Sequence, residues 1–137
     1  MDKNTSVAVI MTKKVIVADL KTKFSAALKL FLDYQIYHLP VVYDDKLLGI
    51  VSVKDALKAF SERAKDVEDN VDDVITLEDI MTHEPTTVDV SATLGDITEI
   101  LSNAKFRSLP VVEEGKIVGI ISNKDLAVIL NGMLKDA

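Results

Sequence analysis

The stretch that decides the fold is Gly49-Ile50-Val51-Ser52-Val53-Lys54-Asp55, because it recurs as Gly-Ile-Ile-Ser-Asn-Lys-Asp at residues 119–125. In both copies, beta-branched residues that favour an extended strand lead into a serine, which is followed three residues later by an aspartate. Serine is a good N-cap residue, and an acid at the third helical position favours the positive end of a helix. The stretch therefore predicts, twice, a strand that passes directly into a helix.

The repeat extends outward from this stretch in both directions. A constant shift of 70 residues superposes residues 10–57 on residues 80–127 without a gap, and further matches gather at Ile10-Met11-Thr12 and at Leu39-Pro40-Val41-Val42. A repeat of this length is typical of one supersecondary unit whose apolar face needs the other copy to cover it. Two copies therefore predict a pair of repeats that cover each other, because a long open solenoid would need more copies.

The hydrophobic periodicity changes in the same order in both copies. Short beta-branched runs at residues 15–17 and 86–88 predict strands, and apolar residues at helical spacing follow from Phe24 and from Leu94. Two strand-like runs then flank the polar residues Asp44-Asp45-Lys46, which suit a tight hairpin, before the final helix. The sequence predicts an α+β fold of two beta-alpha-beta-beta-alpha repeats packed as one pseudo-twofold module.

The expected boundaries follow from the repeat. We assign residues 1–65 to the first repeat with its N-terminal segment, residues 66–79 to an acidic linker, and residues 80–137 to the second repeat. The linker is rich in acid and is expected to be solvated. Thr76 is positioned to cap a short helix that enters the second repeat.

Charge and composition exclude several classes of function. The chain has 22 acidic and 16 basic residues, and no cluster of Lys and Arg long enough for a polynucleotide, so no nucleic-acid partner is expected. It has no cysteine, and no run of about 18 apolar residues that would insert into a membrane. The N-terminus lacks the pattern of a signal peptide, so we expect a cytoplasmic protein.

The Ser-x-x-Asp pairs have two interpretations. In the first, Ser52 and Ser122 cap their helices, and Asp55 and Asp125 stabilise the first turn. In the second, the aspartate accepts hydrogen bonds from the two hydroxyls of a ribose, while the helix N-terminus favours a phosphate. Both can hold at once.

Met-Thr near the start of each repeat, then Leu-Pro-Val-Val, then Gly-Ile-Val-Ser-x-x-Asp, resembles the cystathionine-beta-synthase (CBS) domain family over both copies. The resemblance implies a tandem pair, or Bateman module, with clefts between the copies that hold adenosine compounds. It implies that Asp55 and Asp125 bind ribose, and that Ser52 and Ser122 contact ribose or phosphate.

The resemblance also implies contacts to phosphate and to the base. Basic residues at or near the start of the Leu-Pro strand or after the serine are phosphate candidates, namely His38, Arg107, Lys54 and Lys124. Base candidates lie near the first strand and the Pro-containing strand: Lys14, Val15, Ile16, Val17, Leu39, Pro40, Pro85, Thr86, Thr87, Val88, Leu109 and Pro110. Most of these are also ordinary core residues.

The function implied is that of a regulatory or sensor module for AMP, ADP, ATP or S-adenosylmethionine, with no catalysis of its own. The sequence has neither a phosphate-cradling Gly-x-x-x-x-Gly-Lys nor a His pair at metal-ligand spacing, so no metal or further cofactor is expected. A homodimer and a regulated enzyme or transporter are the implied partners. The alternative is a ligand-free dimerisation module, with Phe24, Phe31, Phe60, Leu126 and Met133 among the apolar residues on its helical faces.

Overall fold

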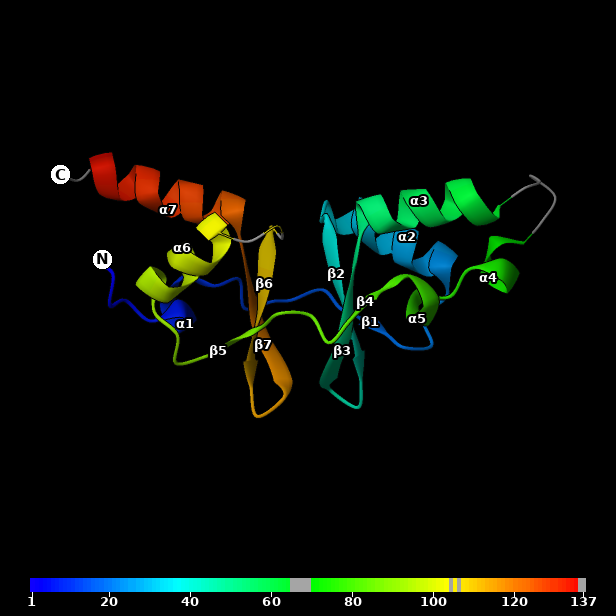
Figure 1. The fold of residues 1–137 in the computed structure, drawn as a ribbon, viewed down its shortest axis with the longest axis horizontal. Helices are drawn as coiled ribbons and strands as arrows, with labels where there is room; N and C mark the ends of the chain where they lie inside the picture. Colours follow the sequence, from blue (N-terminus) through cyan, green and yellow to red (C-terminus); the bar gives the residue numbers. More distant parts are fainter. Residues whose placement is uncertain (65–69, 104, 106, 136–137) are drawn as a thin grey trace. The chain divides into compact units, whose positions relative to one another are not determined.

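A computed structural model describes residues 1–64, 70–103, 105 and 107–135, and it divides into two compact units (Figure 1). We call residues 16–85 the central unit, and residues 1–15 together with 86–137 the outer unit. These limits differ from the expected boundaries, because the first 15 residues fold with the second repeat and residues 80–85 fold with the first. The two repeats have exchanged the segments that precede them.

The central unit contains the first beta-alpha-beta-beta-alpha run and a short helical tail. The run consists of β1 (Ala18–Asp19), α2 (Phe24–Tyr34), β2 (His38–Tyr43), β3 (Lys46–Ser52) and α3 (Val53–Arg63), and the tail of α4 (Val71–Val74), α5 (Leu77–Ile80) and β4 (Thr82–His83). Strand β1 is parallel to β2, whereas β2 and β3 are antiparallel, as are β3 and β4.

The outer unit repeats this plan. It consists of α1 (Val7–Ile10), β5 (Val88–Asp89), α6 (Leu94–Asn103), β6 (Ser108–Glu113), β7 (Lys116–Ser122) and α7 (Asn123–Lys135). The N–H of Thr12 donates to the carbonyl of Ile120 at 2.9 Å, and the N–H of Ile120 donates to Thr12 at 3.0 Å. Thr12 therefore takes the place on β7 that Thr82 takes on β3. The predicted beta-alpha-beta-beta-alpha order is confirmed in both units.

The first strand of each unit is shorter and later than the sequence predicted. Residues 15–17 form no strand, and pairing begins at Ala18, which lies opposite Val41. In the outer unit pairing begins at Val88, which lies opposite Val111. The parallel neighbour decides where the strand forms, and it outweighs the local preference of the beta-branched residues.

Both hairpins turn through two residues with positive φ. These angles are 50° and 65° at Asp44 and Asp45, and 52° and 81° at Glu114 and Gly115. Two consecutive left-handed residues make a type I′ turn, whose twist matches that of the flanking strands. The predicted tight hairpin is confirmed.

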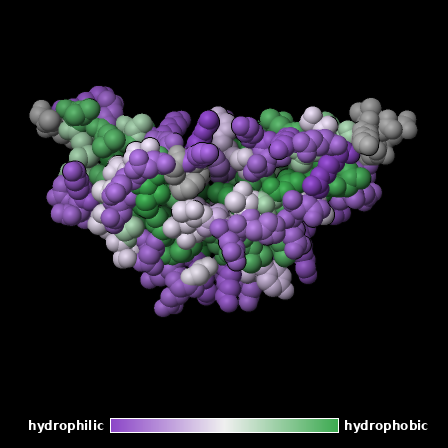
Figure 2. Space-filling model, viewed as in Figure 1, coloured by the Kyte–Doolittle hydropathy of each residue, from purple (hydrophilic) through white to green (hydrophobic). Residues whose placement is uncertain are grey.

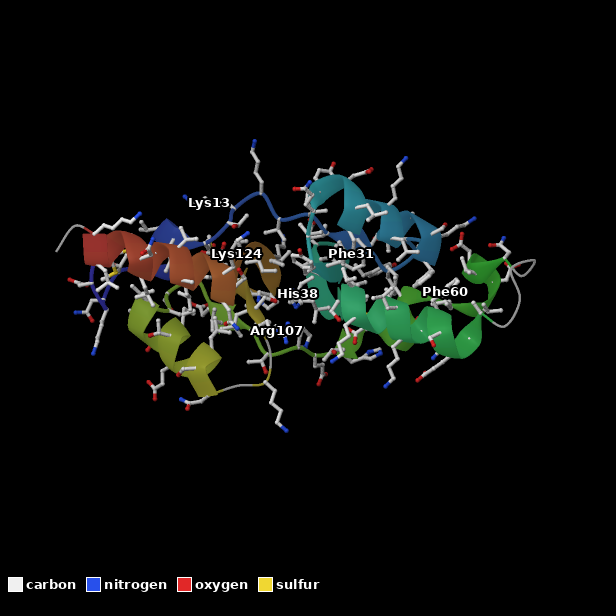
Figure 3. The ribbon with its side chains drawn as sticks, turned by 90° about the horizontal axis from the view of Figure 1, so that it is seen from above. Lys13, Phe31, His38, Phe60, Arg107 and Lys124 are labelled. Carbon is white, nitrogen blue, oxygen red and sulfur yellow. The ribbon has the colours of Figure 1, made fainter. Side chains whose placement is uncertain are left out.

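Each unit has its own hydrophobic core. In the central unit, Phe24 and Phe31 of α2 pack with Leu39 and Val41 of β2, and in the outer unit Leu126 of α7 joins the corresponding core. These three helical residues are buried, so they belong to the cores and are not available for a dimer face, a division that the sequence left open. Phe60, by contrast, is 50% exposed (Figure 3).

The expected linker is folded over much of its length. Ile75 and Leu77 are each 1% exposed in the core of the central unit, because they are the large apolar residues that this acidic segment can bury. Asp72 accepts hydrogen bonds from the Ser25 N–H at 2.8 Å and the Ser25 hydroxyl at 2.6 Å. Thr76 caps α5, as predicted. The expectation of a solvated linker is therefore wrong for residues 70–79, and residues 65–69 lie outside the described residues.

Candidate functional site

The junction of β3 and α3 carries the first Ser-x-x-Asp pair. The Ser52 hydroxyl oxygen accepts a hydrogen bond from the Asp55 N–H at 3.0 Å, and Asp55 Oδ2 accepts one from the Ser52 N–H at 3.0 Å. Both residues are half-buried. The two bonds satisfy N–H groups that the start of a helix otherwise leaves unpaired, so the capping interpretation is confirmed here.

The junction of β7 and α7 repeats the arrangement. The Ser122 hydroxyl oxygen accepts from the Asp125 N–H at 3.2 Å, and Asp125 Oδ2 accepts from the Ser122 N–H at 2.9 Å. Among the described residues, Oδ1 of either aspartate takes no hydrogen bond, and each serine hydroxyl keeps its proton to donate. The cap therefore fixes the two side chains at each junction. It leaves one carboxylate oxygen and one hydroxyl proton, which suit the two adjacent hydroxyls of a ribose.

The residue before the Leu-Pro strand lies beside each junction. The Tyr37 carbonyl accepts a hydrogen bond from the Val53 N–H at 2.9 Å, and the Arg107 carbonyl accepts one from the Asn123 N–H at 2.9 Å. The backbone thus holds both residues against the first turn of α3 or α7. Sequence reasoning missed Tyr37, although the shift of 70 that relates the repeats places it opposite Arg107.

The four phosphate candidates divide equally between the two units. Lys54 and Lys124 are the second residues of α3 and α7, and both are exposed. His38 is half-buried at the start of β2, opposite Ser52, and Arg107 is exposed in the outer unit (Figure 3). Each junction therefore has a basic side chain on its helix and another beside it.

The base candidates fall into two groups. Leu39 and Leu109 are fully buried in the two cores, Val88 is 7% exposed, and packing accounts for all three side chains. Pro40 and Pro110 are also buried, opposite Ile50 and Ile120.

The other base candidates lie where the chain passes from one unit to the other. Lys14, Val15, Thr86 and Thr87 belong to the outer unit, and Ile16, Val17 and Pro85 belong to the central unit. Lys14 and Thr86 are exposed, and the other five are half-buried. The structure does not bring this second group into a single unit.

The described part of the chain has neither a cluster of metal-ligating side chains nor a membrane-spanning helix. Groups of three or more His, Cys, Asp or Glu residues that could hold a metal ion are absent from it. None of its helices has the length and apolar character needed to cross a membrane.

Two beta-alpha-beta-beta-alpha units, each with a capped Ser-x-x-Asp at its second strand-to-helix junction, define a tandem-repeat protein of one specific class. The model of the CBS domain matches residues 7–62 and residues 77–132. The chain therefore belongs to the CBS domain family, as the resemblance of its motifs predicted.

Solved structures and curated relatives agree with this assignment. The CBS domain pair of protein MJ0100, in complex with 5′-methylthioadenosine and S-adenosyl-L-methionine, is 27% identical, with a TM-score of 0.80 over 94% of this chain and 98% of that one. CBSX2, from Arabidopsis thaliana, in complex with AMP is 29% identical, with a TM-score of 0.80 over 95% of this chain and 98% of that one.

A curated relative, the uncharacterised protein MJ0188 of Methanocaldococcus jannaschii, is 36% identical over 118 residues, or 85% of this chain. The chain spans 40% of the length of that relative.

Proposed function

We propose that this CBS pair is a regulatory module that binds an adenosine compound, such as AMP, ADP, ATP or S-adenosylmethionine, and catalyses no reaction itself. The observation that carries the proposal is the doubled Ser-x-x-Asp, in which one carboxylate oxygen is engaged in the cap and the other takes no hydrogen bond from the part of the chain that the structure describes. A ribose offers two adjacent hydroxyl donors to such an oxygen. The adenosine compounds bound by the MJ0100 pair and by CBSX2 support the same class of ligand.

Regulation requires that the ligand bind one conformation of the chain more tightly than another. A partner or a second subunit then responds to the change in population. We predict that the partner is an enzyme or a transporter. The binding of the ligand in a cleft between the repeats and a cytoplasmic location are also predictions.

A thermal-shift panel tests the proposal. AMP, ADP, ATP, 5′-methylthioadenosine and S-adenosylmethionine are added to the wild type and to the double variant Asp55→Ala/Asp125→Ala, with GMP as a control for the base. A ligand that binds the folded state alone raises the unfolding midpoint. We expect at least one adenosine compound to do so in the wild type and none in the double variant. No shift from any of them in the wild type would count against the proposal.

A purely structural role is the second candidate, because apolar side chains remain exposed on the long helices. Leu57 and Phe60 of α3 are 63% and 50% exposed, and Leu134 of α7 is 76% exposed. Figure 2 shows hydrophobic atoms at the surface over α7. Light scattering of the wild type and of Phe60→Lys measures the mass of the assembly. A dimer that becomes a monomer in the variant, with no adenosine compound bound, would favour the structural role.

A further inference from the structure

Each unit packs one methionine against a buried glycine in the second strand of its hairpin. A Cβ on Gly119 of β7 would clash with the sulfur of Met11 and would lie 2.7 Å from its Cγ. A Cβ on Gly49 of β3 would lie 2.5 Å from the sulfur of Met81 and 2.8 Å from its Cγ. In both units, therefore, the absence of a glycine side chain lets the thioether lie directly on the strand backbone.

In the outer unit this contact helps to hold residues 1–15 on β7. Met11 donates its N–H to the carbonyl of Val7 at 2.9 Å, and its neighbour Thr12 exchanges both backbone hydrogen bonds with Ile120. The Met11 side chain packs against the core of the outer unit, in which Val7 is fully buried. Met11 therefore connects α1, the core and β7 through one side chain.

The methionines differ in their exposure to solvent. Met11 is half-buried, whereas Met81 is 7% exposed. A peroxide must reach the sulfur to oxidise it, so susceptibility follows exposure. We therefore expect a peroxide to oxidise Met11 well before Met81. Met1, which is 64% exposed and belongs to neither core, is an accessible methionine for comparison.

Oxidation changes the Met11 side chain from apolar to polar. Hydrogen peroxide transfers one oxygen atom to the sulfur: the O–O bond breaks, an S–O bond forms, the sulfur is oxidised and the peroxide is reduced to water. The polar sulfoxide must then lie against the apolar core of the outer unit. The backbone N–H groups of Met11 and Ile120 already donate to Val7 and Thr12, so they do not offset this cost.

The residues that follow Met11 connect it to the candidate site. Lys14 and Val15 belong to the outer unit, and both are base candidates. We propose that Met11 is an oxidation site whose sulfoxide releases residues 1–15 from β7, and that this release weakens the binding of an adenosine compound. The release depends on the contacts of Met11 alone, whereas the effect on binding rests on the proposed function.

Peroxide treatment of the full chain, followed by peptide mass spectrometry, tests the oxidation site. We expect the sulfoxide to form at Met11 at least about tenfold faster than at Met81, because access to the sulfur controls the rate. Met1 is expected to react at least as fast as Met11. Equal rates at Met11 and Met81, or a faster rate at Met81, would overturn the assignment of the site.

Amide hydrogen exchange without ligand tests the release. After oxidation we expect the N–H groups of Val7, Met11 and Thr12 to exchange at least about tenfold faster, because local opening becomes easier. Unchanged exchange in the oxidised wild type would overturn the release.

Three variants show whether Met11 is the cause. Met11→Gln, which places a polar side chain at this position, should exchange faster without peroxide. Met11→Leu should not respond to peroxide, because a hydrophobic side chain of similar volume is tolerated in a core. Met1→Leu is the matched control and should respond as the wild type does. Circular dichroism checks that the variants are folded. A response of Met11→Leu equal to that of the wild type would show that another residue is responsible.

Titration calorimetry with AMP and 5′-methylthioadenosine tests the effect on binding. We expect the affinity for at least one of them to fall at least about fivefold on oxidation and to recover after treatment with methionine sulfoxide reductases. An unchanged affinity after release of the segment would overturn the effect on binding and leave the proposed function intact. If neither probe binds the reduced protein, the proposed function fails with respect to both ligands and the effect on binding fails with it. The exchange measurements still decide the release in that case.

Discussion

Asp125→Ala separates the two roles of the Ser-x-x-Asp pair. The substitution removes the carboxylate oxygen that accepts the Ser122 N–H at 2.9 Å, at a half-buried position. Loss of a helix cap costs about 1 kcal/mol, within a range of about 0.5 to 2 kcal/mol. Without ligand, we therefore expect the free energy of unfolding to fall by about 1 kcal/mol, and the midpoint to fall by about 3 °C.

The same variant should differ more from the wild type when ligand is present. A ligand at 100 times its dissociation constant stabilises the folded state by about 2.7 kcal/mol. If Asp125 binds the ribose, the variant loses this stabilisation at the Ser122/Asp125 site. Its free energy of unfolding then lies between about 3 and 4 kcal/mol below that of the wild type, compared with about 1 kcal/mol without ligand. Urea unfolding followed by circular dichroism, with and without saturating AMP, measures both deficits.

Asp96→Ala is the matched control, because α6 of the same unit begins with the same reciprocal bonds. Asp96 Oδ2 accepts from the Thr93 N–H at 3.0 Å, and the Thr93 hydroxyl oxygen accepts from the Asp96 N–H at 3.2 Å. This variant should also lose about 1 kcal/mol but keep the full stabilisation by AMP. The ribose role is refuted if Asp125→Ala retains that stabilisation, and the capping role if the variant loses no stability without ligand.

Four further substitutions test other parts of the structure. Gly49→Ala should lower the free energy of unfolding by about 1–3 kcal/mol, because its Cβ would lie 2.7 Å from the backbone oxygen of Thr82 in β4. Gly132→Ala, whose Cβ meets nothing within 4 Å, should instead raise it by about 0.5–1 kcal/mol; urea midpoints that fall equally in both would contradict the packing argument. Hydrogen bonds from α2 hold the pKa of Asp72 below its ordinary value of 3.8, so this carboxylate stabilises the fold above pH 3.8 and that contribution is lost as the pH falls through the lowered pKa. Asp72→Asn should therefore be less stable than the wild type at pH 7 and converge with it in acid, and a constant difference in unfolding midpoint down to pH 2 would rule this out. Asp45→Gly should raise the urea midpoint, with a gain of up to about 1 kcal/mol, because φ is 65° there; a lower midpoint would contradict the turn assignment.

Local features of the fold could be predicted from the sequence because local rules decide them. The serine caps and the hairpin at Asp44-Asp45 depend on residues within a few positions of one another, and both are present in the structure. The first strands were placed wrongly, because their pairing with Val41 and Val111 depends on a neighbour that is distant in the sequence.

The exchange of segments could not be read from the repeat. A shift of 70 relates Val7 to Leu77, but it does not say that Val7 packs in the core of the outer unit and Leu77 in that of the central unit. For the site, the sequence found both Ser-x-x-Asp pairs. It missed Tyr37, which bonds to the first residue of α3 through its backbone carbonyl, because no local sequence pattern marks such a residue.

The exchange has a consequence for the order in which the protein folds during synthesis. The central unit is one continuous segment of residues 16–85, so all its partners are available soon after its last residue leaves the ribosome. The outer unit must wait, because Val7 donates its N–H to Ala92 and Thr12 pairs with Ile120. Until Ile120 has been synthesised, residues 1–15 have no partner in their own unit. The chain between them and Ile120 forms a long loop, and closing this loop costs conformational entropy. A central unit that is already folded reduces this cost, because it shortens the flexible part of the loop.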